Sequence, residues 1–356
     1  MKRNLLLPLL VVLVGSALQA QKGFTIRVAG GYAWPGFMKT EGITGPKVDP
    51  YTPYNDALVP MANLNYFNDS AKTYSPVRGS YGQGMNFSLG LGYNINRYIG
   101  VEMGVSFLKS DEIKARQDYE LVYEPYPNAG FSGSGYHMIS EITTKALEVA
   151  LSPAVTLRAA KPGWKVYPHA RIGLSLPVYG NLTHDIKIDV QDSVFIVGGD
   201  AIVQILDTAP YFIGRHTDVK LKTEGTVSLG INGAIGVTYQ PLPYLSVFAE
   251  VNGQYLVTRA KSSKITKWDA DGVSKLEDRG KYRTEFNFVD EIDETSNNGD
   301  YHKDSDGNSK YDPNKPKDDI RPFGPFSNIG VNVGVIFTLS KETLTKKNSK
   351  SKEDKK

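Results

Sequence analysis

The feature that most restricts the fold of this chain is a long alternation of apolar with small polar residues. In residues 85–95, every second position holds Met, Phe, Leu, Tyr or Ile, and Gly, Asn and Ser fill the positions between. A period of two residues is typical of a β-strand with two different faces. Most such segments span 11 or more residues, whereas strands average about 5–6 residues and a tilted membrane-spanning strand needs about 9–11. The eight segments are 24–34, 85–95, 99–107, 142–159, 164–179, 221–239, 244–259 and 328–339.

The connections between these segments alternate between short and long. Three are tight turns rich in Asn, Pro or Gly, and four are much longer. Short turns on one side and long loops on the other are typical of bacterial outer-membrane barrels. The pattern therefore predicts an all-β fold, an eight-stranded antiparallel transmembrane up-and-down β-barrel with four long extracellular loops and both termini in the periplasm. The turns are 94–97, 161–163 and 240–243, and the loops are 36–81, 109–141, 180–220 and 260–327.

The two faces of the segments indicate which side meets lipid. A water-soluble eight-stranded barrel of the lipocalin type is the alternative, and it would face water with Lys, Glu and Thr while keeping apolar residues inside. Here the polar face is mainly Gly, Ser, Asn and Ala, which suit a narrow interior, and the apolar face is nearly free of charge. A charge on a lipid-facing surface costs about 2–4 kcal/mol at mid-bilayer. We therefore expect the apolar face to point toward lipid.

Six charged residues occur on the small-residue face. Buried charges are tolerated when they are paired and hydrogen-bonded, so three acids and three bases predict an ion-pair network across the lumen. This network would either close the barrel or provide a gated path for protons or small ions. The residues are Arg27, Glu102, Glu148, Arg158, Arg171 and Glu250. Aromatic residues near the strand ends fit two interfacial girdles, with Tyr98, Trp164, Tyr239 and Tyr244 at one end and Trp34, Tyr179 and Tyr255 at the other.

The two ends of the chain differ from its body. Residues 1–20 combine two basic residues, a short apolar run and small residues before a plausible cleavage site, which predicts a secretory signal peptide. A membrane anchor is the alternative, but the run is too short for a spanning helix and Pro8 interrupts it. The barrel domain is then 21–340. Residues 341–356 carry seven Lys and predict a disordered, Lys-rich periplasmic tail, which could alternatively touch a polyanion such as cell wall or lipid headgroups.

Composition excludes several function classes. Subtracting four net charges for the tail and two for the signal from the total of +3 leaves −3, so the body offers no basic face for nucleic acid. The chain has no Cys, only 5 His, and no HExxH, GxSxG, P-loop or GxGxxG element. We expect no enzymatic activity. The alternative is an outer-membrane hydrolase or acyltransferase built on His137, His184 or His216 with nearby acids such as Asp185 and Asp218.

The fourth predicted loop carries a candidate calcium site. Asp304, Asp306, Asn308 and Asp312 offer oxygen ligands at alternate positions. The match to an EF-hand loop is incomplete, because Gly307 comes fourth instead of sixth and no bidentate Glu ends the run. An ordinary acidic surface loop is the alternative, and no other cofactor is expected. The first two loops interleave Pro with Tyr and Phe, which predicts either a ligand-binding cap or an ordered lid of aromatic residues packed on one another.

The last segment contains Asn332, Gly334, Phe337 and Leu339 in the order polar, any, Gly, two of any, apolar, any, apolar. This pattern resembles the C-terminal assembly signal of the small outer-membrane β-barrel proteins of Gram-negative bacteria, the OmpA/OmpX/OmpW-like superfamily. The resemblance spans about 24–339 and implies recognition by the barrel-assembly machinery. Family members often end on the aromatic residue or add a peptidoglycan-binding domain, whereas this chain adds only the tail, so a wall-binding role is not carried over.

The predicted function follows from the location. We expect a protein of the cell outer membrane with a structural, adhesion or interaction role through its surface loops, because function often resides on loops held by a rigid scaffold. A narrow channel for small or apolar solutes, opening laterally or through the lumen, is the alternative. The expected partners are outer-membrane lipid and lipopolysaccharide, the barrel-assembly machinery and an extracellular ligand or surface partner, and nucleic acid is not among them.

Overall fold

The computed structural model describes residues 23–36, 44–47, 55–67, 70–123, 131–161, 163–196, 211–277 and 279–340. Within these ranges the chain is all-β, as predicted, and the one helix described is α2 (Lys281–Thr284). No helix in the described part is long and apolar enough to cross a membrane. The predicted signal peptide at 1–20 and the predicted tail at 341–356 lie outside the described residues.

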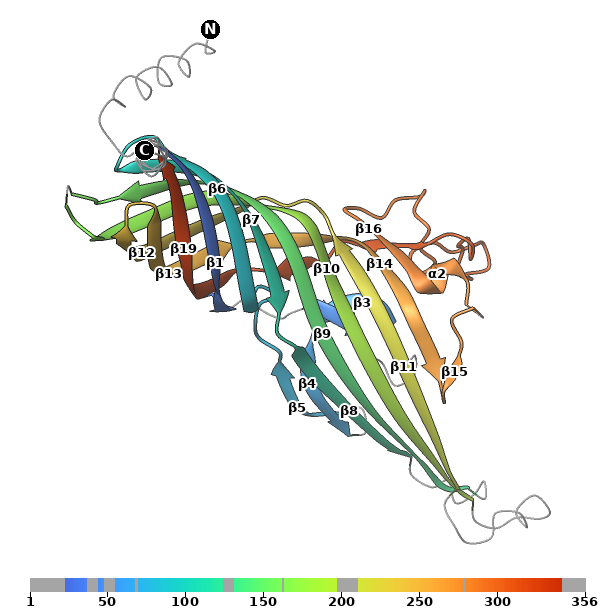
Figure 1. The fold of residues 1–356 in the computed structure, drawn as a ribbon. Helices are drawn as coiled ribbons and strands as arrows, with labels where there is room; N and C mark the ends of the chain where they lie inside the picture. Colours follow the sequence, from blue (N-terminus) through green and yellow to red (C-terminus); the bar gives the residue numbers. More distant parts are fainter. Residues whose placement is uncertain are drawn as a thin grey trace, which may run out of the picture.

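Eight strands form a closed ring (Figure 1), in which each strand is hydrogen-bonded to two antiparallel neighbours. They follow one another around the ring in chain order, and the last strand closes it by pairing with the first. Phe337, for example, lies opposite Ile26 on one side and Leu245 on the other. The ring strands are β1 (Gly23–Pro35), β6 (Gly84–Asn94), β7 (Ile99–Ser110), β9 (Phe131–Arg158), β10 (Val166–Ile196), β12 (Gly230–Leu242), β13 (Leu245–Tyr255) and β19 (Asn328–Ser340).

Two of these strands continue far beyond the ring. The outer parts of β9 (131–146) and β10 (181–196) remain paired with each other, and three further strands join them: β8 (Ile113–Tyr123), β11 (Tyr211–Gly225) and β14 (Val257–Ala270). We call this sheet the extension, and Figure 1 shows it projecting away from the ring. The prediction of long loops at 36–81, 109–141 and 180–220 is therefore wrong, because most of their described residues lie in strands.

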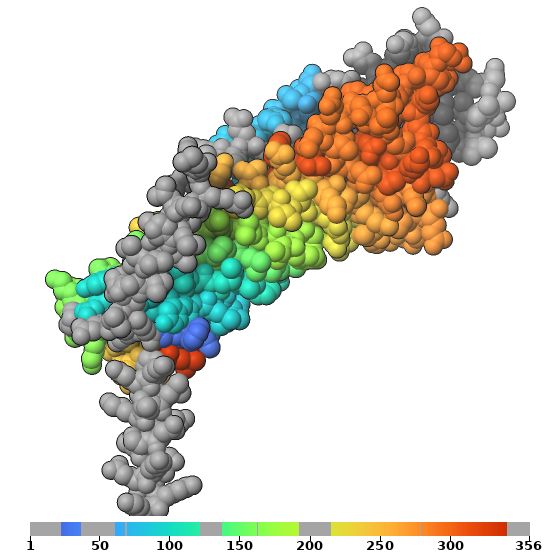
Figure 2. Space-filling model, turned by 90° about the horizontal axis from the view of Figure 1, so that it is seen from above, coloured from blue at the N-terminus to red at the C-terminus, as the bar shows by residue number. Residues whose placement is uncertain are grey.

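Smaller strands lie along the extension and the rim of the ring. β2 (Thr44–Lys47) pairs with β3 (Asn55–Pro60), and β4 (Ala62–Phe67) pairs with β5 (Ser70–Pro76) and runs parallel to β8. β15 (Val273–Ser274), β16 (Glu285–Val289) and β18 (Phe323–Pro325) pair with β14, and β17 (Lys317–Ile320) pairs with β16. In Figure 2 the orange segments between about 257 and 320 gather at one end of the molecule, away from the blue and red ring strands.

The two faces of β9 exchange their character at the boundary between ring and extension. Within the ring, the outward side chains are apolar and exposed, from Leu147 to Leu157, and the inward positions hold polar or small residues such as Ser152. Within the extension, the outward side chains include Glu141 and Lys145. The inward side chains are buried and alternate between apolar and small polar residues, from Met138 and Ser140 to Thr144 and Ala146. The ring therefore presents an apolar exterior, and the extension presents a polar one.

A β-bulge marks the same boundary in β10. Pro177 lies opposite Ala150 and Tyr179 lies opposite Val149, so Val178 is an extra residue in the pairing. One extra residue moves the following side chains to the opposite face. The inward positions are accordingly odd-numbered in the ring, as at Arg171, and even-numbered in the extension, where His184 is buried.

The inward face of the extension holds a hydrophobic core outside the ring. The core joins side chains from β9, β10, β11 and β14 to residues of the predicted first and fourth loops. Tyr66 of the predicted first loop stacks on Tyr119 of the predicted second, with ring centroids 5.1 Å apart. This contact agrees with an ordered lid of aromatic residues. The largest core residues include Met61, Tyr81, Met138, Ile142, Ile186, Leu221, Ile265, Trp268, Phe286, Phe288 and Phe326.

Candidate functional site

Four of the six charged residues predicted for the lumen meet inside the ring. The Glu250 carboxylate accepts hydrogen bonds from Arg27 at 2.5 Å and from Arg171 at 3.0 Å. Glu102 lies 3.8 Å from the Arg27 guanidinium and 3.9 Å from that of Arg171. We call these four residues the charge cluster. Two carboxylates and two guanidiniums balance one another, which is the condition under which buried charges are tolerated.

The strand pattern places these side chains at one level. Arg27, Glu102, Arg171 and Glu250 lie on four different ring strands, each at an inward position between outward apolar residues. The neighbouring inward positions are small, and Gly90 shows why. A Cβ atom at Gly90 would lie 2.6 Å from the Glu102 carboxylate. The small-residue face therefore provides the space in which long charged side chains cross the lumen.

Two further residues complete the packing of the cluster. The Arg27 guanidinium lies over the Phe248 ring, 4.4 Å from its centroid, a favourable cation–π geometry. Phe248 in turn lies against Gly334, where a Cβ atom would be 2.7 Å from the aromatic ring and 2.2 Å from the Val28 carbonyl oxygen. Only glycine fits there without displacing backbone. Gly334, predicted as part of the assembly signal, thus also has a packing role.

Cavities lie on both sides of the charge cluster. The larger, about 70 Å³, is lined by inward residues toward the extension, including Ser106, Ser152 and Gln254. The smaller, about 20 Å³, lies toward the short turns and is lined by Thr25, Thr156 and others. Both cavities border on Arg27, Glu102 and Arg171. Both spaces are large enough for water, and the cluster lies between them.

The other two predicted lumen charges lie apart from the cluster. Arg158 lines the smaller cavity, and in the described part of the chain it joins none of the cluster's ion pairs. Glu148 lies at the extension end of the ring, buried, where its Oε1 accepts a hydrogen bond from Gln254 at 3.4 Å. The structure therefore brings together four of the six residues in one network and leaves Glu148 and Arg158 at opposite ends of the lumen.

Sequence reasoning missed two polar members of the site. His169 Nε2 lies 3.3 Å from the Glu250 carboxylate, and its Nδ1 lies 3.0 Å from the Thr238 hydroxyl. Asn332, considered only as part of the assembly signal, donates a hydrogen bond to Glu250 at 3.5 Å. A signal for His169 existed, because it precedes Arg171 by two residues and so shares its inward face.

The other assembly-signal positions divide between the two faces of β19. Asn332 and Gly334 point inward, whereas Phe337 and Leu339 are exposed on the apolar exterior. β19 also forms the seam that closes the ring, paired with β1 and β13. Recognition by an assembly machinery stays a prediction.

The candidate calcium residues have hydrogen-bond partners within their own loop. Asp304 Oδ1 accepts from the backbone amides of Asp306 and Asn308 at 2.9 and 2.8 Å, and these bonds, led by the Asn308 amide, lower the pKa of the Asp304 carboxyl. Asp312 accepts from the Asn314 amide at 2.9 Å and lies 3.6 Å from Lys315. Within the described ranges, no group of three or more His, Asp or Glu side chains is arranged to hold a metal ion.

The three histidines considered for catalysis occupy different environments. His184 is fully buried beside the Thr144 hydroxyl at 2.8 Å, and burial lowers its pKa to about 4. His137 lies 2.8 Å from Asp118 on the extension. His216 lies between Asp189 at 2.6 Å and Asp218 at 3.2 Å, exposed near the end of the extension. The expectation that the protein is not an enzyme stays a prediction.

Comparisons with known proteins found little similarity. No protein-family model matches this chain, and no curated protein matches it. Among solved structures, the chain is similar to the crystal structure of CarO2 from Acinetobacter baumannii. That similarity covers 71% of this chain and 92% of the other, with 14% sequence identity and a TM-score of 0.21. A likeness this weak carries no conclusion about the fold or the function of the chain.

Proposed function

We propose that this chain is an integral outer-membrane protein, with the ring spanning the bilayer and the extension standing outside it as an interaction platform. The observation that carries the proposal is the exchange of faces along β9. Outward side chains change from charged at Lys145 to apolar at Leu147 within two residues. On the inward face the large apolar residues Met138 and Ile142 occur only on the extension side of that point. One continuous strand thus passes from a water-facing to a lipid-facing environment.

The exterior of the ring supports membrane residence. Large apolar side chains are exposed on every ring strand, among them Met85 at 70%, Ile235 at 72% and Leu91 at 64%. Water-soluble monomers rarely expose apolar patches larger than a few hundred Å². A belt of this kind around a closed ring matches the lipid-facing band of outer-membrane barrels, whereas the water-soluble lipocalin type would place these residues inside.

Aromatic side chains at the two ends of the belt fit the two interfaces. Tyr98, Trp164, Tyr239 and Tyr244 are exposed at the short-turn end, and Trp34, Tyr179 and Tyr255 are exposed at the end next to the extension. Tyr and Trp are favoured at membrane interfaces because the ring is buried while the polar tip stays hydrated. With the short turns in the periplasm, the extension lies on the cell surface.

The interior of the ring favours an anchor over a channel. The charge cluster, Phe248 and His169 contact one another across the lumen, between the two small cavities. The extension has its own apolar core and a polar exterior, so it can present a rigid surface to a ligand or partner. We therefore infer a structural, adhesion or recognition role.

Two measurements test this function. Protease added to intact cells is expected to cleave the extension, and a tag on a short turn is expected to resist until the outer membrane is opened. Purified protein in a planar bilayer is expected to stay silent. Recovery of the chain in the water-soluble fraction would refute the membrane assignment, and reproducible unitary currents would favour the narrow channel.

We also retain calcium as a proposed ligand of the loop at 304–312, where it would bridge the loop to lipopolysaccharide phosphates. The oxygen-rich sequence supports this proposal, and the Asp304 carboxylate accepts hydrogen bonds from two backbone amides of the same turn. Calcium is expected to slow proteolysis of this loop in wild type and to have no effect in Asp306→Ala. Equal cleavage of the wild type with and without calcium would end the proposal.

A further inference from the structure

The wall of the ring has a break on one edge of β10. β12 pairs with β10 as far as Ser175, and β11 begins to pair only at Asn181. Among the described residues, no strand pairs with 176–180 of β10 on that edge, and the bulge at Val178 falls in the same stretch. The chain between β11 and β12 passes beside this gap, at 226–229.

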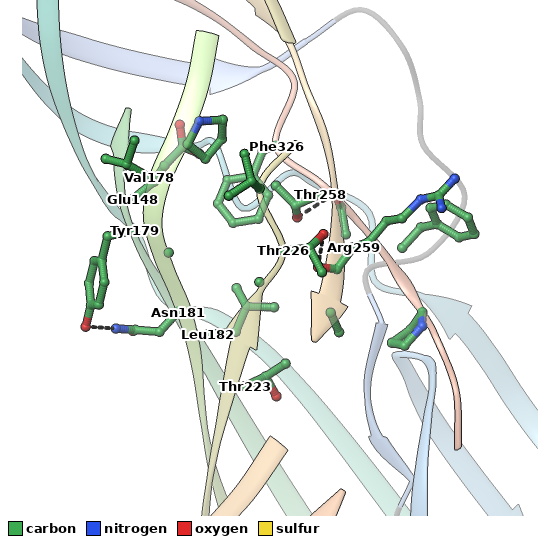
Figure 3. A pocket seen from close by; sticks show the side chains of 18 residues that line it. Glu148, Val178, Tyr179, Asn181, Leu182, Thr223, Thr226, Thr258, Arg259 and Phe326 are labelled. Atoms are coloured by element: carbon green, nitrogen blue, oxygen red, sulfur yellow. Dashed lines mark hydrogen bonds between the residues drawn. The ribbon is translucent and has the colours of Figure 1, made fainter. Parts of the chain in front are cut away.

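A pocket of about 70 Å³ occupies the break. Figure 3 shows Val178, Tyr179 and Asn181 on one side of it and Thr226, Thr258 and Arg259 on the other. Its polar side chains are mostly engaged with one another or with backbone. Thr226 donates to the Arg259 carbonyl at 3.2 Å, Thr258 donates to the Gly324 carbonyl at 3.3 Å, and Asn181 donates to Tyr179 at 2.7 Å.

Glu148 is the exception. This buried residue, 4% exposed, lines both the pocket in the wall and the larger cavity of the lumen. Its Oε1 accepts a hydrogen bond from Gln254, a residue of the lumen cavity, whereas its Oε2 has no hydrogen-bond partner among the described residues. A buried carboxyl oxygen without a donor is costly, so this site lacks a hydrogen-bond donor next to an apolar wall.

The surroundings of the pocket indicate which kind of molecule supplies a hydrogen-bond donor to Glu148 Oε2. The pocket lies where the apolar exterior of the ring meets the polar exterior of the extension. Exposed apolar side chains lead away from it along the ring, at Val178, Val227, Leu229 and Ile231. At about 70 Å³ it is far smaller than the roughly 300–1,000 Å³ of pockets that enclose drug-sized ligands. The pocket therefore accommodates the small polar head group of a ligand, while an apolar chain attached to that head group lies along the apolar exterior of the ring.

The geometry points to a binding site for a membrane lipid whose head group carries an N–H ammonium, with the ammonium at Glu148 and an acyl chain along Val227, Leu229 and Ile231. When it is ionised, a carboxylate is acceptor-only and forms its strongest hydrogen bonds with cationic donors, and a bound cation in turn favours the ionised form. A phosphatidylethanolamine head group has such a donor at interfacial depth, whereas a phosphatidylcholine head group has none. This inference rests on the proposed membrane residence of the ring.

The test compares these two lipids on the purified full-length chain. The protein is placed in nanodiscs with equal amounts of phosphatidylethanolamine and phosphatidylcholine of identical chains, and the lipid that remains bound on release is counted by native mass spectrometry. We expect about a tenfold preference for phosphatidylethanolamine in wild type, the size expected of one charge-assisted hydrogen bond. Glu148→Gln is expected to reduce the preference to less than about twofold.

Two further variants test whether the lipid preference depends on Glu148 and on the pocket itself. Glu141→Gln, on the outward face of the same strand beyond the ring, is expected to keep the wild-type preference. Thr226→Trp fills the pocket while leaving Glu148 in place, and this variant is expected to lose the preference for phosphatidylethanolamine. It tests the lipid site even if Glu148→Gln fails to fold. Equal retention of both lipids by a wild-type protein that enters the nanodiscs would overturn the lipid site alone. Failure to enter nanodiscs of either lipid would overturn the proposed function.

Discussion

Lys145 and Leu147 are adjacent on the outward face of β9, yet they belong to different environments. The Lys145 ammonium lies 2.8 Å from the Glu112 carboxylate, whereas Leu147 begins the apolar series that continues through Leu151 and Val155. On the neighbouring strand, Lys109 lies opposite Leu147. The apolar exterior thus ends at one level on adjacent strands, and the proposed function places the boundary of the bilayer at this level.

A charge introduced on the exterior of the ring is expected to destabilise the folded protein. Leu151→Lys places an ammonium in the lipid-facing band and should reduce the free energy of unfolding in lipid vesicles by about 2–4 kcal/mol. The matched control is Glu141→Lys on the outward face of the extension. This variant loses an exposed ion pair with Arg116, so a loss of no more than about 1 kcal/mol is expected. Denaturant titration of both variants measures the difference, and equal losses would argue against a lipid-facing ring.

Removal of the shared acceptor in the charge cluster is expected to be costly. Glu250→Ala leaves Arg27 and Arg171 buried without their shorter contacts, and breaking a buried ion pair on one side costs about 3–5 kcal/mol. Glu102→Ala is the control, because its contacts are 3.8 and 3.9 Å long, and a smaller loss is expected. If the two variants unfold at the same denaturant concentration, Glu250 is not the centre of the network.

Gly334 is expected to be essential for closing the ring. A Cβ atom there would lie 2.2 Å from the Val28 carbonyl oxygen on the adjacent strand, so Gly334→Ala should disturb the pairing of β19 with β1. The control is Gly233→Ala, where the nearest atom lies at an ordinary 3.6 Å. Heat-modifiable migration on a gel reports whether the ring is closed. A folded band of normal intensity for Gly334→Ala would contradict the prediction.

His216 is expected to titrate above its ordinary pKa. The hydrogen bond to Asp189 raises the pKa of this imidazole, and Asp218 adds to the effect. The charged pair is fully formed below the unfolded pKa of about 6.5, and its contribution is lost as the pH rises through the raised value. NMR titration should place the midpoint above 6.5, and Asp189→Asn should lower it. An unchanged midpoint in that variant would exclude the hydrogen bond as the cause.

Much of the ring could be predicted from the alternation of residues alone. From Met85 to Tyr93 the exposed residues are the apolar ones, and the short turns fall where Asn and Pro indicated them. The extension was not predicted, because its alternation of residues has the opposite orientation to that of the ring: the apolar residues face inward and the charged ones outward. In 182–190, Asp185, Lys187 and Asp189 alternate with buried Ile and Val, so the period of two continues there with charged residues on the outward face. The extra residue at Val178 further hides this continuity.

The charge cluster was predictable in part. The alternation along a strand tells which side chains share a face, and it places all six predicted charged residues on the small-residue face. The alternation does not give the depth of a residue along the lumen, because depth depends on the stagger between strands. Glu148 and Arg158 therefore could not be separated from the other four, and the wall pocket beside Glu148 depends on pairing that only the structure reveals.

The most direct test of membrane residence uses the absence of cysteine from the chain. Single Cys residues placed at 141, 143, 151 and 155 of β9 carry spin labels with no background, and collision with oxygen or a water-soluble nickel complex reports lipid or water. We predict water exposure at 141 and 143 and lipid exposure at 151 and 155. Water exposure at all four positions would contradict the account.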